Sequence, residues 1–398
     1  MEIRLFDMKI NFFDIGRKYW TIIAIISIVA LGVYVRTYDY HYPYLRNIDS
    51  YAFTRQITDI SEHGTLNTYD NLSLAPGGES RPISADLYVF IMAYAYNFVR
   101  FFFGGYTLFQ FLIWAPALMT SLMAVPMYFI GRLLYDKRAG VLAAFFVVFD
   151  LSIMSRTLGG DPDNDASVLL FPLIAIALFL LAYKYTNQKG FDKKGVLHTI
   201  IAGIGMGAWG YVWSGFWFVI WLIAGFVTVK IILNIAKSRK LSSVKELKRP
   251  IILFVAVMLI FFVVTVPIFG TGIITSTVQG PFSFSDIKGE ENRPFPNVYV
   301  SVAELQSGGT INDILQRTNI FLMAFMLASL VYLAVSTIIK KKDHIDTLIL
   351  LAIWFIGPVI ATTIGVRFSI LFAAPVALGA GIMISKLFRI INGEGVTD

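Results

Sequence analysis

Long apolar runs, separated by short stretches of charged and turn-forming residues, repeat along almost the whole chain. A helix that crosses a bilayer needs roughly 20 mostly apolar residues, and these runs approach or reach that length. The pattern therefore predicts an all-α polytopic membrane protein with about ten or more transmembrane helices. The expected spans cover residues 20–35, 106–130, 141–154, 166–182, 196–210, 211–230, 251–269, 319–339, 347–364 and 368–386.

The composition supports this class of protein. Hydrophobic residues make up 57% of the chain, charged residues 15%, and mean hydropathy is +0.69. The absence of cysteine excludes disulfides and thiolate chemistry, and four histidines argue against a multi-histidine zinc site. The net charge of +7 could suggest nucleic acid as a partner. The basic residues lie mainly in short loops between apolar runs, however, as in cytoplasmic loops, so no nucleic-acid partner is expected.

The basic residues also orient the chain. Four of them lie between positions 4 and 18, before the first span, which places the amino terminus in the cytoplasm. Two long loops, 37–105 and 270–317, are then external. Residues 83–103 inside the first loop are apolar, but a crossing there would move Lys340–Lys342 and the other basic loops outside. We therefore expect this stretch to be a helix lying in the membrane interface.

An acidic turn separates the third and fourth expected spans. It reads Ser-Arg-Thr-Leu-Gly-Gly-Asp-Pro-Asp-Asn-Asp from residue 155. Carboxylates at the edge of a membrane are costly, so such a cluster indicates a functional site. Asp163 and Asp165, two positions apart, suit a shared divalent cation with oxygen ligands. The simpler alternative is a cap for the helix beginning near Ala166. Asp161 lies outside this pair and is assigned to the turn before Pro162.

The predicted topology places four polar segments on the external side: residues 47–51, 156–165, 301–304 and Arg367. Each has a simple alternative explanation. Asp49 could be a lone loop carboxylate, Glu304 could be an ordinary solvated charge, and Arg367 could reach from a helix end to the interface. Because all four lie on one side, a common external active site is the better interpretation.

The four segments carry recognisable motifs in a fixed order. They read Asn-Ile-Asp-Ser-Tyr-Ala-Phe from residue 47, the acidic turn from residue 155, Ser-Val-Ala-Glu from residue 301, and Gly-Val-Arg-Phe from residue 365, with Pro375 following. This ordered set resembles the catalytic subunit of the asparagine-linked oligosaccharyltransferases, in its archaeal type. The resemblance implies a GT-C-type glycosyltransferase scaffold. It also implies transfer of an oligosaccharide en bloc from a polyprenyl or dolichyl (pyro)phosphate carrier to the side-chain amide of Asn in Asn-X-Ser/Thr sequons.

The resemblance also implies partners and a cofactor. The partners are a lipid-linked oligosaccharide donor, an acceptor polypeptide with the sequon, and membrane lipid. Asp49, Asp163 and Asp165 would bind a Mn²⁺ or Mg²⁺ ion, with Arg156 beside the second acidic motif. A hard cation with oxygen ligands would fix the carboxylates and offset charge on the departing phosphate.

Glu304 and Arg367, together with Asp49, would act on the substrates. By the resemblance, Glu304 and Asp49 would hold the acceptor amide, and Arg367 would bind the carrier phosphate. The chemistry agrees, because an amide nitrogen is a poor nucleophile with a delocalised lone pair, and two carboxylates accepting its N–H groups could orient it. An arginine presents a planar fork that matches a phosphate.

The resemblance is incomplete in one respect. Family members carry a soluble external domain with a Trp-Trp-Asp motif after the membrane region, whereas no Trp follows Trp354 here. We therefore expect residues 1–398 to form the transmembrane catalytic domain without the C-terminal sequon-recognition domain. Such a chain should bind donor and metal but glycosylate peptide poorly.

Two other functions remain as alternatives. Another glycosyltransferase with a lipid-phosphate sugar donor, such as a protein O-mannosyltransferase, could also place an acidic pair in its first external loop. An ion-coupled transporter would instead place charges near the middle of its spans and show matching halves. The acids of this chain lie mainly in loops and no matching halves are visible, so the transporter is the weaker alternative.

Overall fold

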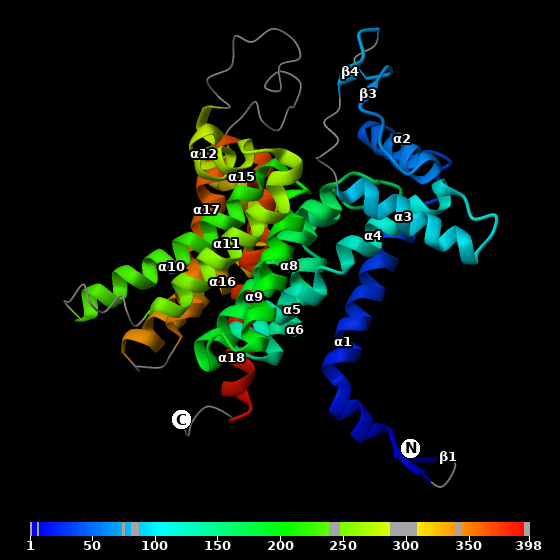
Figure 1. Cartoon of the computed structure of the whole chain (residues 1–398). Helices are drawn as coiled ribbons and strands as arrows, with labels where there is room; N and C mark the ends of the chain where they lie inside the picture. Colours follow the sequence, from blue (N-terminus) through cyan, green and yellow to red (C-terminus); the bar gives the residue numbers. More distant parts are fainter. Residues whose placement is uncertain are drawn as a thin grey trace.

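The computed structural model of the chain describes residues 2–5, 8–73, 76–80, 87–238, 247–286, 309–339 and 344–393. Most of these residues are helical and form a bundle in which the start of α1 and the end of α18 lie at the same end, here called the end of the termini (Figure 1). The helices of the bundle are α1 (Phe12–Thr37), α4 (Leu108–Ser121), α5 (Ala124–Leu134), α6 (Lys137–Val148), α8 (Asp165–Lys189), α9 (Lys193–Gly210), α10 (Trp217–Ser238), α11 (Lys248–Phe269), α16 (Ile320–Ile338), α17 (Ile345–Ile364) and α18 (Ala373–Ile391).

The predicted class of fold is confirmed. Each of the ten expected spans coincides with one of these helices or with a consecutive pair. Within the described ranges, eight helical stretches are long and apolar enough to cross a membrane. Hydrocarbon offers no hydrogen-bond partner to backbone N–H and C=O groups, and a helix satisfies these groups internally. The chain is therefore a multi-pass α-helical membrane protein.

Two expected spans, 141–154 and 196–210, form helices that are not among the eight. The first is α6, which ends at Val148. The carboxylate of Asp150 then caps the short helix α7 (Leu151–Met154) by accepting the N–H of Ser152 at 2.9 Å. The second is α9, whose glycine-rich sequence lowers its hydropathy and brings α11 close. A Cβ atom added at Gly203 would lie 2.5 Å from the Cβ of Ile260.

Short elements cover the end of the bundle opposite the termini (Figure 1). The chain also forms two small antiparallel hairpins, one at its N-terminal end and one beside α2. The covering elements are α2 (Ile48–His63), the hairpin of β3 (Tyr69–Asp70) and β4 (Glu79–Ser80), α3 (Leu87–Phe102), α12 (Gly272–Asp286) and α15 (Ile311–Arg317). The remaining elements are β1 (Glu2–Leu5), β2 (Met8–Asn11), η1 (Ser214–Phe216) and η4 (Val366–Phe372).

The apolar stretch of the first long loop forms α3. With 16 residues it is a shorter apolar helix and not one of the candidate spans, as the charge distribution predicts. It packs on α2, where the rings of Phe53 and Tyr88 meet edge to face with centroids 5.8 Å apart. Toward its C-terminal end it exposes Phe98 and Phe101. Figure 1 shows α3 lying across the end of the bundle.

Small residues let α18 pack closely on its neighbours α6 and α16. A Cβ atom at Gly379 would lie 2.7 Å from the Cγ of Met326 in α16. One at Gly381 would lie 2.8 Å from the carbonyl oxygen of Ala139 in α6. Such close approach is how helices associate in lipid, where no hydrophobic effect drives them together. The packing fixes η4, which directly precedes α18.

The acidic turn between α7 and α8 is held by backbone contacts with two other helices. The Gly159 N–H donates to the carbonyl of Arg36 at the end of α1 (2.7 Å), and the Gly160 N–H donates to the carbonyl of Ile113 in α4 (3.1 Å). A Cβ atom at Gly159 would lie 2.9 Å from the Arg36 oxygen and 3.1 Å from the Ile113 oxygen. Only glycine therefore lets the turn approach both helices.

We predict that Gly159→Ala destabilises the protein by about 1–3 kcal/mol, because the added methyl group meets backbone atoms that cannot rotate away. Thermal unfolding in detergent measures the effect. The control is Gly104→Ala, where a Cβ atom would meet nothing within 4 Å. Equal melting temperatures for the two variants would contradict the prediction.

Candidate active site

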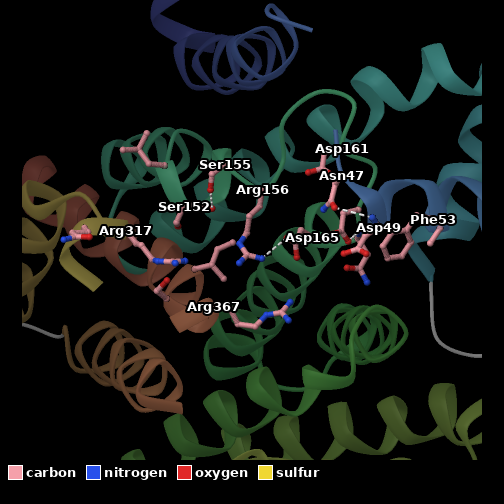
Figure 2. Close-up of a pocket in the computed structure, with 17 residues that line it drawn as sticks. Asn47, Asp49, Phe53, Ser152, Ser155, Arg156, Asp161, Asp165, Arg317 and Arg367 are labelled. Atoms are coloured by element: carbon pink, nitrogen blue, oxygen red, sulfur yellow. Dashed lines mark hydrogen bonds and ion pairs between the residues drawn. The ribbon is translucent and has the colours of Figure 1, made fainter. Parts of the chain in front are cut away.

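A cavity of about 970 Å³ opens at the end of the bundle opposite the termini and gathers residues from four separate segments. Figure 2 shows the side chains that line it. They come from the start of α2, from the stretch running from α7 through the acidic turn into α8, from the end of α15, and from η4. Five of the predicted site residues line this one cavity: Asp49, Arg156, Asp163, Asp165 and Arg367. Glu304 lies outside the described residues.

Asp49 lies in the first turn of α2. The side chain of Asn47 caps this helix by accepting the Asp49 N–H at 3.3 Å. The positive end of the helix dipole favours a carboxylate here. The Asp49 carboxylate accepts no hydrogen bond from the described part of the chain, so its oxygens face the cavity without a protein donor. Asp49 therefore lies on a helix and shares the cavity with other acids, unlike a lone loop carboxylate.

The acidic turn supplies Asp163 and Asp165 from the end that leads into α8. Asp165 is the first residue of α8 and forms an ion pair with Arg156 at 3.4 Å. The N-cap residue Asn164 makes no side-chain capping hydrogen bond. The Asp163 carboxylate accepts only the N–H of its neighbour Asn164, at 2.5 Å, among the hydrogen bonds of the described residues. Helix capping alone therefore does not account for these acids.

The environment disfavours charge on Asp163. Burial raises its pKa to about 7, helped by the nearby charges of Asp165, Asp161 and Asp49 and opposed by the hydrogen bond from Asn164. The four carboxylates thus act on one another electrostatically although they come from two segments. Negative charge from neighbouring carboxylates is therefore part of what holds the pKa of Asp163 above its usual range.

Asp161 belongs to this site, although its sequence position suggested only a turn. It lines the cavity and accepts a hydrogen bond from the Ser50 hydroxyl at 2.7 Å, which ties the turn to α2. Burial raises its pKa, and that hydrogen bond opposes the rise. The i, i+2 spacing of Asp161, Asp163 and Asp165 continues through all three residues and could have indicated this role.

The donor atoms suit a hard divalent cation, because carboxylate oxygens are the ligands that such ions prefer. Asp49, Asp163 and Asp165 line the same cavity and interact electrostatically. In the portion of the chain that the structure describes, no three acids or histidines are close enough together to form a finished metal site. The chemistry therefore fits a cation, and binding would require the carboxylates to draw together.

Arginines line the cavity beside these acids. Figure 2 shows Arg156, Arg317 and Arg367 together with Asp165. Arg367, in η4, makes no hydrogen bond or ion pair with any residue of the described ranges. It lines the cavity. Arg317, the last residue of α15, was not anticipated, because its distance from the other motifs along the chain gives no sign of its position.

The chain matches the family described as "Oligosaccharyl transferase STT3, N-terminal" over residues 19–392. It is 22% identical over 391 residues to a dolichyl-phosphooligosaccharide-protein glycotransferase of Methanococcus voltae, covering 88% of this chain and 42% of that protein. Its identity to the enzyme of the same name from Methanocaldococcus jannaschii is 26% over 266 residues, or 63% of this chain and 28% of the relative.

Solved structures show the same fold. The oligosaccharyltransferase AglB from Archaeoglobus fulgidus, in complex with an inhibitory peptide and a dolichol-phosphate, has a TM-score of 0.72 and 18% identity over 96% of this chain and 53% of that one. ArnT from Cupriavidus metallidurans bound to undecaprenyl phosphate has a TM-score of 0.53 and 12% identity, covering 95% and 62%. The chain covers 42% of the Methanococcus voltae protein and 53% of the Archaeoglobus fulgidus chain, which is about half of their length. Since the family match covers nearly every residue, this chain belongs to the STT3 family of oligosaccharyl transferases.

Proposed function

We propose that this chain transfers an oligosaccharide en bloc from a dolichyl or polyprenyl (pyro)phosphate carrier to the side-chain amide of Asn in Asn-X-Ser/Thr sequons. The observation that carries the proposal is the meeting of three acids and two arginines from three motifs in one cavity. The relatives support it, since they are named dolichyl-phosphooligosaccharide-protein glycotransferases. A similar solved structure is tethered to an acceptor peptide containing an NVT sequon.

On the donor side, Arg367 would bind the carrier phosphate. Its guanidinium is available in the cavity and can form two parallel charge-assisted hydrogen bonds with phosphate oxygens. During transfer the bond between the sugar C1 and the phosphate oxygen breaks, and the phosphate leaves with the electron pair. The lipid tail would remain in the bilayer while its head group enters the cavity.

On the acceptor side, Asp49 and Glu304 would accept the two N–H groups of the asparagine amide. The amide nitrogen forms the new bond to the sugar C1 and loses one proton, which a neighbouring carboxylate can take. Holding the two substrates together would supply about 7–11 kcal/mol of the barrier reduction. Asp49 is suited to this role, because its carboxylate faces the cavity and accepts no hydrogen bond from any described residue.

Asp49, Asp163 and Asp165 would hold a divalent cation, for which we propose Mn²⁺ or Mg²⁺. When bound, the cation would neutralise the carboxylates and act as a Lewis acid toward the phosphate. One similar solved structure is a complex with Zn and sulfate. Arg156, paired with Asp165, would keep that carboxylate in place.

We infer that residues 1–398 form one transmembrane catalytic domain, with loops 37–105 and 270–317 and the cavity on the external face of a cell membrane. The amino terminus would be cytoplasmic. The basic residues before α1 support this orientation. The position of the cavity at the end opposite both termini agrees with it (Figure 1).

A second candidate is another transferase that uses a lipid-phosphate sugar, such as a protein O-mannosyltransferase. The likeness to ArnT bound to undecaprenyl phosphate shows that this fold is not confined to oligosaccharyltransferases. Supplying sequon peptides and Ser/Thr peptides in parallel separates the two. Transfer to the Ser/Thr peptides alone would replace the proposed reaction with that of the second candidate.

We predict that Asp49→Ala and Asp163→Ala each weaken Mn²⁺ binding at least about tenfold, because each removes a ligand. Isothermal titration calorimetry of the purified chain measures the affinity. Asp59→Ala is the matched control, since Asp59 lies on the same helix as Asp49 but does not line the cavity. Unchanged affinity in both cavity variants would remove the cation from the proposal.

We predict that Asp163→Asn raises the melting temperature in the presence of a chelator. The folded pKa of Asp163 is about 7, above its unfolded value, so the folded state binds this proton more tightly. The wild type therefore loses stability relative to the variant as pH rises from about 4 to 7, and the difference levels off above 7. Melting curves at several pH values measure it. A constant difference across this range would contradict the assignment.

We predict that Arg367→Ala weakens binding of a dolichyl-phosphate lipid about tenfold or more, and that Arg367→Lys restores only part of the affinity. Lysine keeps the charge but not the planar fork. Microscale thermophoresis in detergent measures the affinity. Arg100→Ala is the control, because Arg100 lies in the last turn of α3 and does not line the cavity. Equal losses in both alanine variants would indicate general electrostatic attraction.

A further inference from the structure

Arg36, in the last turn of α1, is a charged residue buried away from the active-site cavity. Only 1% of its surface is exposed. It makes no ion pair with any residue that the structure describes. Its guanidinium donates instead to three neutral acceptors: the Gly32 carbonyl (3.2 Å), the Val148 carbonyl (2.6 Å) and the Thr157 hydroxyl oxygen (3.1 Å).

The positions of these acceptors explain how a buried charge is tolerated. Gly32 lies in the final turns of α1, and Val148 is the last residue of α6. The C-terminal end of a helix carries partial negative charge and has carbonyl groups without helical partners. Arg36 therefore connects the last turn of α1 to the negative end of α6 at Val148, and oriented carbonyls offset its charge.

The third acceptor belongs to the acidic turn. Thr157 is 1% exposed, and its hydroxyl donates its single hydrogen to the Ile153 carbonyl at 2.8 Å. That bond leaves an oxygen lone pair to accept from the Nε of Arg36, which fixes the hydroxyl in one orientation. The beginning of the turn is thus locked to the end of α1 by a side chain.

The backbone at the same point provides a second attachment. The Arg36 carbonyl accepts the N–H of Gly159, and Arg46 donates to the same turn from its Nε to the Gly159 carbonyl (3.0 Å) and from its N–H to the Gly160 carbonyl (2.9 Å). The chain between Arg36 and Arg46 leads directly to Asp49. The segment that carries Asp49 therefore continues from the end of α1, and the acidic turn is hydrogen-bonded to that same end.

We propose that Arg36 is a positioning residue for the candidate cation site, acting through Thr157 to set the acidic turn against the start of α2. The inference rests on the proposed function for the cation itself. Arg36 does not line the cavity. Its role is to hold the turn that carries Asp163 and Asp165 near the segment that carries Asp49, so that only the carboxylate side chains need to draw together when a cation binds.

Three threonine variants test the proposal. Thr157→Val keeps the shape of the side chain but removes the acceptor for Arg36. Thr157→Ser keeps the hydroxyl and should rescue the effect. Thr186→Val is the matched control, because Thr186 is fully buried in α8 and its hydroxyl also donates to the carbonyl four residues earlier, at 2.8 Å. It therefore measures the general cost of losing such a hydroxyl.

The first measurement is Mn²⁺ affinity by calorimetry. We expect Thr157→Val to weaken binding about tenfold, as loss of partners that orient metal ligands does. Thr157→Ser and Thr186→Val should stay within about twofold of the wild type. A purely structural role would lower the melting temperature of Thr157→Val and leave the affinity of the folded protein unchanged, which would overturn the proposal.

The second measurement does not depend on a metal. The chain has no cysteine, so Leu158→Cys and Glu62→Cys introduce two unique sites for spin labels, one in the turn and one in α2. We expect Thr157→Val to broaden the distance distribution between the labels and Thr157→Ser to leave it unchanged. An unchanged distribution in Thr157→Val would refute the positioning role. If the wild type binds no Mn²⁺, the cation proposal fails and this distance measurement decides the role of Arg36.

Discussion

Mutual repulsion among carboxylates is the constraint on which the candidate active site of this protein depends. Asp49, Asp161, Asp163 and Asp165 come from two segments and share one cavity, where burial and neighbouring charge raise the pKa of Asp163 to about 7. Groups under such repulsion take up protons more readily, and they separate unless the surrounding structure holds them. The contacts around the turn provide that hold.

Those contacts are mainly hydrogen bonds that involve backbone or hydroxyl groups, together with close backbone packing. The Arg156–Asp165 ion pair is partly exposed, and such pairs contribute little to stability. Gly159 between the backbones of α1 and α4, and the Ser50–Asp161 hydrogen bond, are partly or fully shielded from water. The helices thus fix the turn, and the acids keep free oxygens for a ligand. Such contacts position the turn and leave most of the carboxylate oxygens available to bind a charged ligand.

Arginines supply positive charge in the same cavity. Arg156, Arg317 and Arg367 line the cavity that holds the acids. A pair of substrates, one with an anionic phosphate and the other with an amide that donates hydrogen bonds, fits these two kinds of side chain, because each substrate finds complementary groups.

The sequence by itself determined the class of fold, the places of the spans and most of the candidate site. The apolar runs had to become helices because lipid satisfies no backbone polar group, and charge distribution correctly kept α3 out of the spans. Motif order identified Asp49, Arg156, Asp163, Asp165 and Arg367, which meet in one cavity. Only the tertiary structure revealed Asp161 in the site, Arg317 beside it, and Arg36 behind the turn. The residues that they contact lie on other segments of the chain. These contacts depend on how the helices pack against one another, and local sequence patterns do not encode that packing.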